Sequence, residues 1–178
     1  MAIIFPPSTI PDIQNIVSSN PETLILGTRA LSPLKEFYIV LITGGASGGG
    51  AQSFYTDQTA YQNLNPSEFI IDPDNYPGAS FFLEAICRAG ASGDSARTFY
   101  MDLYDVDAGA TVTNSEISTI VTEGAAGPGS LVRVRGVGAS GNFRGNMTSG
   151  SRTYILRYRS GTSLSFVDLY YARFVIAY

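Results

Sequence analysis

The aromatic residues of this chain lie in short segments in which apolar and polar side chains alternate. In residues 97–106, Phe99, Met101 and Leu103 occupy every second position, and the positions between them are polar or Tyr. Successive side chains of a β-strand point to opposite faces, so this pattern predicts one buried face and one outer face. Gly, Ser, Asn and Asp separate the segments, as turn residues separate strands. The pattern is typical of an all-β protein.

Eight segments, alternating or continuously apolar, are predicted to be strands, at residues 37–42, 69–71, 80–88, 97–106, 116–122, 131–136, 152–160 and 165–178. In the 152–160 strand, Tyr154, Leu156 and Tyr158 share one face, opposite Ile155, Arg157 and Arg159. Residues 51–68 are predicted to be a long loop or a weak strand, and no long helix is expected. The spacing predicts a jelly-roll-like two-sheet sandwich over residues 36–178.

Residues 1–35 form a separate segment and hold five of the nine prolines. The segment is too apolar for a solvated tail and too often interrupted by proline for one helix. We expect an extended N-terminal arm that docks its apolar side chains on its own domain or on a neighbour. The side chains expected to make this contact are those of Ile3, Ile4, Phe5, Ile10, Ile13, Ile16, Leu24 and Leu26.

Charged residues make up only 15% of the chain, whereas about a quarter is usual in soluble domains. Strand 37–42 is apolar on both faces, which predicts that both faces are covered. Both observations favour assembly with further copies of the chain, and we expect a homotrimer with Tyr38 and Val40 at a contact. A Gly- and Ser-rich surface with little charge is the alternative explanation.

The formal charge of −4 is unevenly distributed, with −10 in residues 1–130 and +6 in residues 131–178. A basic face for nucleic acid or for an acidic partner is one interpretation. The other is that Arg-rich strands pair with acidic strands, within a subunit or across an interface. The second is favoured because the cations alternate with Tyr and aliphatic residues along strands. We therefore expect Arg133, Arg135, Arg157 and Arg159 to pair with carboxylates or carbonyls, with Arg157 and Arg159 among the subunit contacts.

The residue content limits the chemistry that the chain can perform. It has no His, no Trp and one Cys, which excludes a nucleophile–His pair, a disulfide within the chain and a Cys-based metal site. A carboxylate pair for glycoside hydrolysis is conceivable, but the spacing selects no two of its candidates, which are Glu84, Asp102, Asp105, Glu116 and Asp168. Acidic clusters at residues 72–75 and 102–107 suit calcium or, more simply, Asx turns. We expect no enzyme activity, no cofactor and no metal.

Other segments give weaker indications. The Gly-rich residues 44–50 lack the Lys-Ser/Thr ending of a phosphate-binding loop. The N-terminus has no basic region, so no signal peptide is expected. No segment approaches the roughly 20 apolar residues of a membrane span. We expect a protein that is made in a cytoplasm and has neither membrane nor nucleic acid as a partner.

From Asp72 onward the chain resembles a type of β-sandwich found in tailed-phage virion proteins. The resemblance rests on residues 72–79 before an apolar strand, and on residues 99–106, 115–119 and 167–176. It implies a non-catalytic jelly roll, often trimeric, of the kind that serves as a capsid decoration protein, head fibre or tail-fibre tip. The apolar arm and the absence of a shaft favour a decoration (cement) protein that binds the major capsid protein on the virion surface. A host-surface or carbohydrate-binding module of a fibre or tail is the alternative.

Overall fold

The computed structural model describes residues 25–26, 29–30, 36–43, 54–90, 96–122, 129–136, 141–163 and 166–178, with only the backbone at 25–26, 29–30 and 42–43. The chain divides into two compact units, Met1–Phe37 with Tyr178, and Tyr38–Ala177. Most of the expected arm lies outside the described residues, including its end at residue 35. Of its predicted contact residues, only the backbone of Leu26 is described, and the others lie outside: Ile3, Ile4, Phe5, Ile10, Ile13, Ile16 and Leu24.

The described residues form short and long strands with two 3₁₀ helices, at Pro73–Asn75 and Arg144–Asn146. In the first unit, β1 (Ile25–Leu26) pairs with β2 (Arg29–Ala30). The strands that follow are β3 (Glu36–Thr43), β4 (Phe54–Thr56), β5 (Gln62–Asn63), β6 (Phe69–Ile71), β7 (Ser80–Ala89), β8 (Ala96–Asp105), β9 (Ala110–Thr111), β10 (Ile117–Thr122), β11 (Val132–Arg135), β12 (Arg152–Ser160) and β13 (Val167–Ala177).

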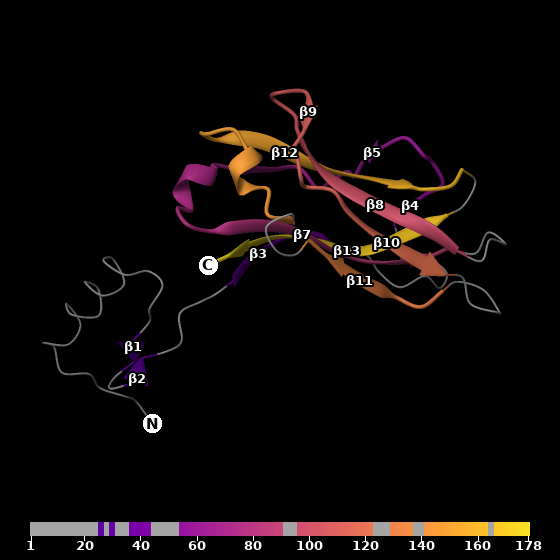
Figure 1. Cartoon of the computed structure of the whole chain (residues 1–178), viewed down its shortest axis with the longest axis horizontal. Coiled ribbons are helices and arrows are strands. Elements are labelled where there is room, and N and C mark those ends of the chain that lie inside the picture. Colours follow the sequence, from indigo (N-terminus) through magenta and orange to yellow (C-terminus); the bar gives the residue numbers. More distant parts are fainter. Residues whose placement is uncertain are drawn as a thin grey trace, which may run out of the picture. The chain divides into compact units, whose positions relative to one another are not determined.

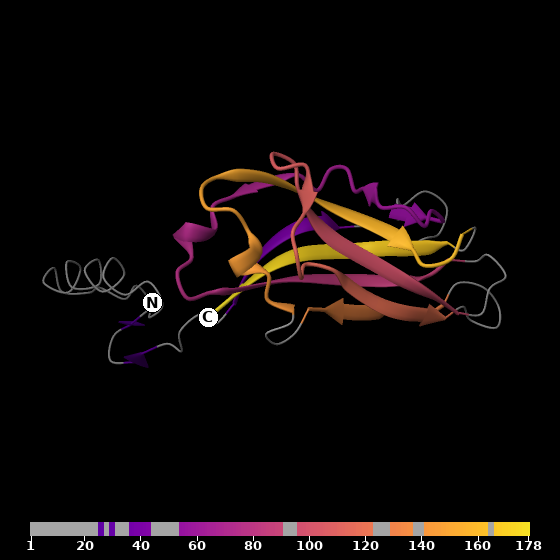
Figure 2. The same cartoon turned by 45° about the horizontal axis from the view of Figure 1, so that its top comes forward.

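These strands form two antiparallel sheets that pack as a sandwich (Figure 1). The five-stranded sheet has the order β11-β7-β13-β3, with β4 also on β13. The six-stranded sheet has the order β10-β8-β12-β5, with β6 on β12 and β9 on β8. Figure 2 shows the long strands β8 and β12 in one layer, over β7 and β13 in the other. The predicted all-β sandwich is confirmed.

The strand order is that of a jelly roll. After β3 and β4, the chain crosses to β5 and β6, returns to β7, and crosses again to β8 and β10. It then passes through β11, β12 and β13, changing sheet at each step. Strands β3 and β4 both pair with β13 and together occupy one position in their sheet, as β5 and β6 do on β12. Each sheet then has four strand positions, and their connectivity is the double Greek key of a jelly roll.

The alternation along the long strands sets which face is buried. Phe99, Met101 and Leu103 of β8 are fully buried in the core between the sheets, as predicted. Tyr154 and Leu156 of β12 are buried in the same core. The eight predicted strands are therefore all present, with ends that differ by no more than two residues.

Aromatic side chains fill one part of the core. The Phe174 ring of β13 lies 5.0 Å from Phe81, 5.6 Å from Phe143 and 5.4 Å from Phe69, measured between centroids, in edge or tilted arrangements. Such geometries are the favourable ones for aromatic pairs. Because these rings come from both sheets and from the segment before the second 3₁₀ helix, they hold the two layers together.

Two features of the strands go beyond the sequence prediction. Residues 51–68, predicted to be a long loop or a weak strand, contain two short strands, β4 and β5. In β13 the register with β7 shifts between Leu169 and Tyr171, a bulge that places both Leu169 and Ala172 in the core. Strict alternation would put them on opposite faces, so the bulge is required to keep the whole strand amphipathic.

The described part of the chain covers one face of strand β3. Ile39 and Leu41 pack against the core, but Tyr38 and Val40 are 45% and 51% exposed. Within the described part of the chain, the outer side of this strand thus presents apolar surface to solvent.

The ring cluster gives a direct test of the core. Phe174→Ala should lower the free energy of unfolding by about 3–5 kcal/mol, because it removes a fully buried ring and leaves a cavity between the sheets. Ile120→Ala is the control, since Ile120 is 66% exposed and should change stability by less than about 0.5 kcal/mol. Urea denaturation measures both, and similar losses in the two variants would contradict the assigned core.

Candidate functional site

The outer face of the six-stranded sheet is organised around a buried ion pair. Asp102 of β8 is directly opposite Arg157 of β12. Two nitrogens of the Arg157 guanidinium donate to the two carboxylate oxygens of Asp102, at 3.0 and 2.6 Å. The Asp102 side chain is only 2% exposed and that of Arg157 is 16% exposed. Burial raises the pKa of Asp102, and the hydrogen bonds and charge of Arg157 offset only part of that rise.

Tyrosine rings cover the two guanidinium groups of β12. The Arg157 guanidinium lies 4.2 Å from the Tyr104 ring centroid and 4.9 Å from Tyr61. The Arg159 guanidinium lies 3.7 Å from Tyr100 and 5.0 Å from Tyr61. Tyr61 therefore contacts both cations, and the Arg and Tyr side chains form a continuous stack across the face. These are cation–π contacts, which Arg makes more often than Lys.

Glu116 completes this network at the edge of the sheet. Its carboxylate accepts a hydrogen bond from the Tyr61 hydroxyl and lies 3.9 Å from an Arg159 nitrogen. Burial and this bond to Glu116 raise the pKa of Tyr61 well above its usual range. At neutral pH, Tyr61 is therefore a hydrogen-bond donor and stays neutral.

The outer face of the five-stranded sheet is organised around Glu84 of β7, which is 2% exposed. Arg135 of β11 and Arg173 of β13 lie directly opposite it on the neighbouring strands. Arg173 and Arg133 contact its two oxygens at 2.8 and 2.6 Å, and Arg135 lies 4.0 Å away. We call these four residues the Glu84 cluster. Burial acts to raise the pKa of Glu84, but the hydrogen bonds and charges of Arg173 and Arg133 outweigh it and lower the pKa.

These contacts support the second interpretation of the uneven charge, in which Arg-rich strands pair with acidic strands. Arg133, Arg135, Arg157 and Arg159 all contact carboxylates of the same chain, as expected for Arg-rich strands that pair with acidic strands. Arg88 also pairs with Asp168, and Arg152 with Asp105. Whether Arg157 and Arg159 also contact another subunit stays a prediction.

The carboxylates of the two acidic clusters accept hydrogen bonds from backbone amides. The Asp72 side chain accepts a hydrogen bond from the Asp74 amide at 2.9 Å. Asp105 accepts one from the Ala108 amide and Asp107 one from the Thr153 amide, both at 2.8 Å. In the described part of the chain, no three His, Cys, Asp or Glu residues are grouped so that they could hold a metal ion. Cys87 is buried, and burial raises its pKa to about 12.

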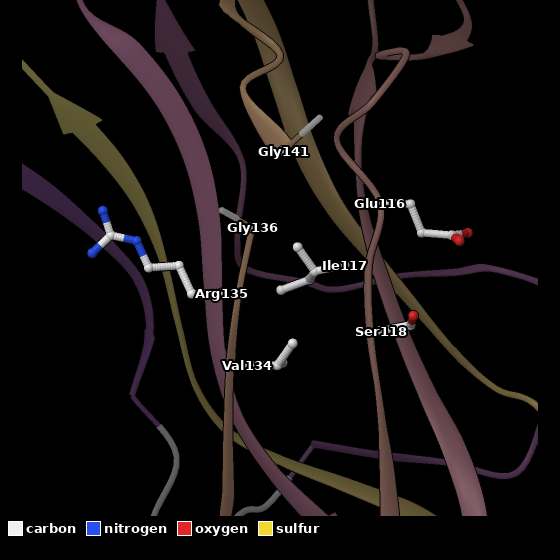
Figure 3. A pocket seen from close by; sticks show the side chains of 7 residues that line it. All are labelled: Glu116, Ile117, Ser118, Val134, Arg135, Gly136 and Gly141. Carbon is white, nitrogen blue, oxygen red and sulfur yellow. The ribbon is translucent and has the colours of Figure 1, made fainter. Parts of the chain in front are cut away.

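A cleft of about 220 Å³ lies between the edge strands β10 and β11 (Figure 3). Ile117 and Val134 line it between the two strands, and the Glu116 and Arg135 side chains point away from each other. At Gly141, an added Cβ would lie 2.8 Å from the Gly136 backbone, so this close approach requires glycine. The cleft has no acid–base pair that faces into it.

No protein-family model matches this chain, and no curated protein matches it. The described residues contain no helix that is long and apolar enough to cross a membrane. A functional conclusion must therefore come from the two outer faces, the edge strands and the sequence.

The sequence analysis named Glu84, Asp102 and Glu116 only as members of a list of strand carboxylates. Their roles as centres of Arg contacts were missed, because the partners come from strands far away in the sequence. Tyr61 was assigned to a long loop or a weak strand with no partner named, so its position over Arg157 and Arg159 was missed too. The only sequence signal for these contacts was an acidic residue at a strand position that faces outward.

The two Arg pairs of β12 should differ in strength. Arg157→Ala leaves the buried Asp102 carboxylate without its partner and should lower the free energy of unfolding by about 3–5 kcal/mol. Arg159→Ala, whose partner Glu116 is 48% exposed, should cost about 1 kcal/mol. Urea denaturation at neutral pH measures both. Equal losses would contradict the distinction.

The pH dependence of stability should report on Glu84. Its pKa in the folded state lies below the ordinary value of 4.5, so the stabilisation that it provides is complete above that value and is lost as the pH falls through the folded-state pKa. Glu84→Gln should therefore show a smaller loss of unfolding free energy than the wild type between about pH 5 and about pH 3. The exposed Glu68→Gln is the control. If Glu84→Gln lost unfolding free energy with falling pH as steeply as the wild type does, this assignment would be contradicted.

Proposed function

We propose that this chain is a non-enzymatic structural protein of a phage virion, a capsid decoration protein that binds the head surface as a homo-oligomer. Jelly rolls occur in viral capsid proteins and in lectins, so the fold is compatible with this role and does not by itself select it. The virion assignment is supported by the resemblance of residues 72–178 to sandwiches of tailed-phage virion proteins.

The observation that carries an assembly role is the outer side of β3. This strand ends the order of the five-stranded sheet, and its Tyr38 and Val40 side chains are about half exposed, at 45% and 51%. Exposed apolar side chains on an edge strand are a site of association with other chains. The strand also follows directly on the apolar, proline-rich residues 1–35, which the sequence analysis assigns to docking.

The charged residues support protein contacts over nucleic acid. Arg157 and Arg159, the cations expected at a contact, are held by carboxylates and Tyr rings of the same chain. A nucleic-acid site needs several cations free to approach phosphates, and its affinity falls steeply with salt. The residue content supports a role without catalysis, since the chain has no His and one Cys.

A carbohydrate-binding role is the alternative, and the Tyr residues of the six-stranded sheet are the observation in its favour. Tyr61, Tyr100 and Tyr104 lie on one outer face, where Tyr rings can contact an apolar sugar face. However, Arg159 and Arg157 already cover a face of each ring. This leaves less ring surface for a sugar and makes the alternative the weaker proposal.

Substitution of Val40 tests the assembly surface. Light scattering of the wild type should give about three times 19.0 kDa. Val40→Lys should shift the protein to a monomer, because a Lys on an edge strand opposes pairing with another chain. Ile120→Lys is the matched control, with an exposed Ile on the other sheet, and should stay trimeric. A monomeric wild type, or a trimeric Val40→Lys, would contradict the proposal.

The virion role has a separate test. Particles purified from cells that carry this sequence should contain the chain, as detected by mass spectrometry, and Val40→Lys should reduce its amount per particle. Failure to find the wild-type chain on particles would leave the oligomer result intact and overturn the virion assignment.

A further inference from the structure

The Glu84 cluster combines a fixed arrangement with an excess of positive charge. Arg133 and Arg173 both contact the single carboxylate of Glu84, so this contact neutralises only one of two positive charges. Arg135 adds a third guanidinium at 4.0 Å. The side chain of Arg133 is 59% exposed, whereas those of Arg135 and Arg173 are 22% and 16% exposed. Arg133 is therefore the group in the cluster that is best placed to contact a partner.

Aromatic rings hold the other two guanidinium groups in place. The Arg173 guanidinium lies 3.7 Å from the Tyr38 ring centroid, and the Arg135 guanidinium lies 5.4 Å from Phe82. A planar group that is already stacked and hydrogen-bonded loses little conformational freedom when it binds a carboxylate. The cluster is thus organised before any partner arrives.

The backbone of β11 adds a second kind of contact. Gly136 donates its amide to the Leu83 carbonyl of β7. Because residues of an antiparallel pair alternate between bonding to the partner and pointing away from it, the main-chain groups of Arg133 point away from β7. Strand β11 ends the strand order of its sheet in the part of the chain that the structure describes. The cleft between β10 and β11 opens beside it.

We propose that β11 and the Glu84 cluster form a docking surface for an extended acidic segment of a partner protein. The segment adds to β11 as a further strand through backbone hydrogen bonds at Arg133, a mode of binding known for exposed sheet edges. Arg133 and Arg135 lie two residues apart on one face, about 7 Å along the strand. An acidic side chain on the same face of the added strand meets the exposed Arg133 guanidinium.

A carboxylate-bearing segment fits the site better than a polyphosphate. The cluster already binds one carboxylate, that of Glu84, through two guanidinium groups. The surface does not depend on the virion assignment, since it requires only a partner with an accessible acidic strand.

The test uses the full chain and a short peptide of alternating Glu and Thr, followed by fluorescence anisotropy. The wild type should bind this peptide and should not bind the same peptide with Gln in place of Glu. Arg133→Ala should weaken binding about tenfold, because it removes a charge-assisted hydrogen bond. Arg152→Ala removes the same charge from the opposite sheet and is the matched control, expected to bind as the wild type does. Circular dichroism verifies that both variants are folded.

Hydrogen exchange separates strand addition from simple charge attraction. The Arg133 amide should exchange more slowly in the presence of the Glu–Thr peptide. Binding without that protection, equal weakening in Arg133→Ala and Arg152→Ala, or no binding to the wild type would each overturn the proposal. Tighter binding of duplex DNA than of the peptide would overturn it as well.

Discussion

The arrangement of this protein depends on acidic side chains that are buried on the outer faces of the sheets and held there by arginines of neighbouring strands. Asp102 meets Arg157, and Glu84 meets Arg173 and Arg133. Each carboxylate is almost inaccessible to water, which is costly unless the charge is paired and hydrogen-bonded. A shift of one residue in strand register would move each acid to the opposite face of its sheet. These pairs therefore specify the register of the central strands as well as the surface.

The same pairs explain the uneven charge along the chain. The acids lie on β7 and β8, and most of the arginines lie on β11, β12 and β13, because the jelly roll interleaves early and late strands in each sheet. A charge distribution that suggests a basic face in the sequence becomes a set of local pairs after folding. In the Glu84 cluster, two guanidinium groups, those of Arg133 and Arg173, share one carboxylate.

The sequence allowed the long strands and their buried faces to be predicted because alternation is a local signal. Phe99 and Leu156 could be assigned to the core without knowing which strands pair. The short strands β4 and β5 were not individually predictable, since they have three and two residues and lie in the mostly polar stretch 51–68. The bulge at Leu169 and the meeting of Arg133 and Arg173 on Glu84 depend on β7 lying between β11 and β13. That order is a property of the whole fold and cannot be read from any one segment.

The single thiol of the chain has a practical consequence. Cys87 is fully buried on β7, with Val132 and Leu169 as its neighbours across the two adjacent strands. A thiol-specific reagent can reach it only when β7 separates from a neighbour or when the layers part, and local openings elsewhere leave it protected. Because no other cysteine competes, the rate of labelling measures how often the centre of the sandwich opens. The labelling rate of Cys87 in the native protein therefore reports how often β7 separates from its surroundings.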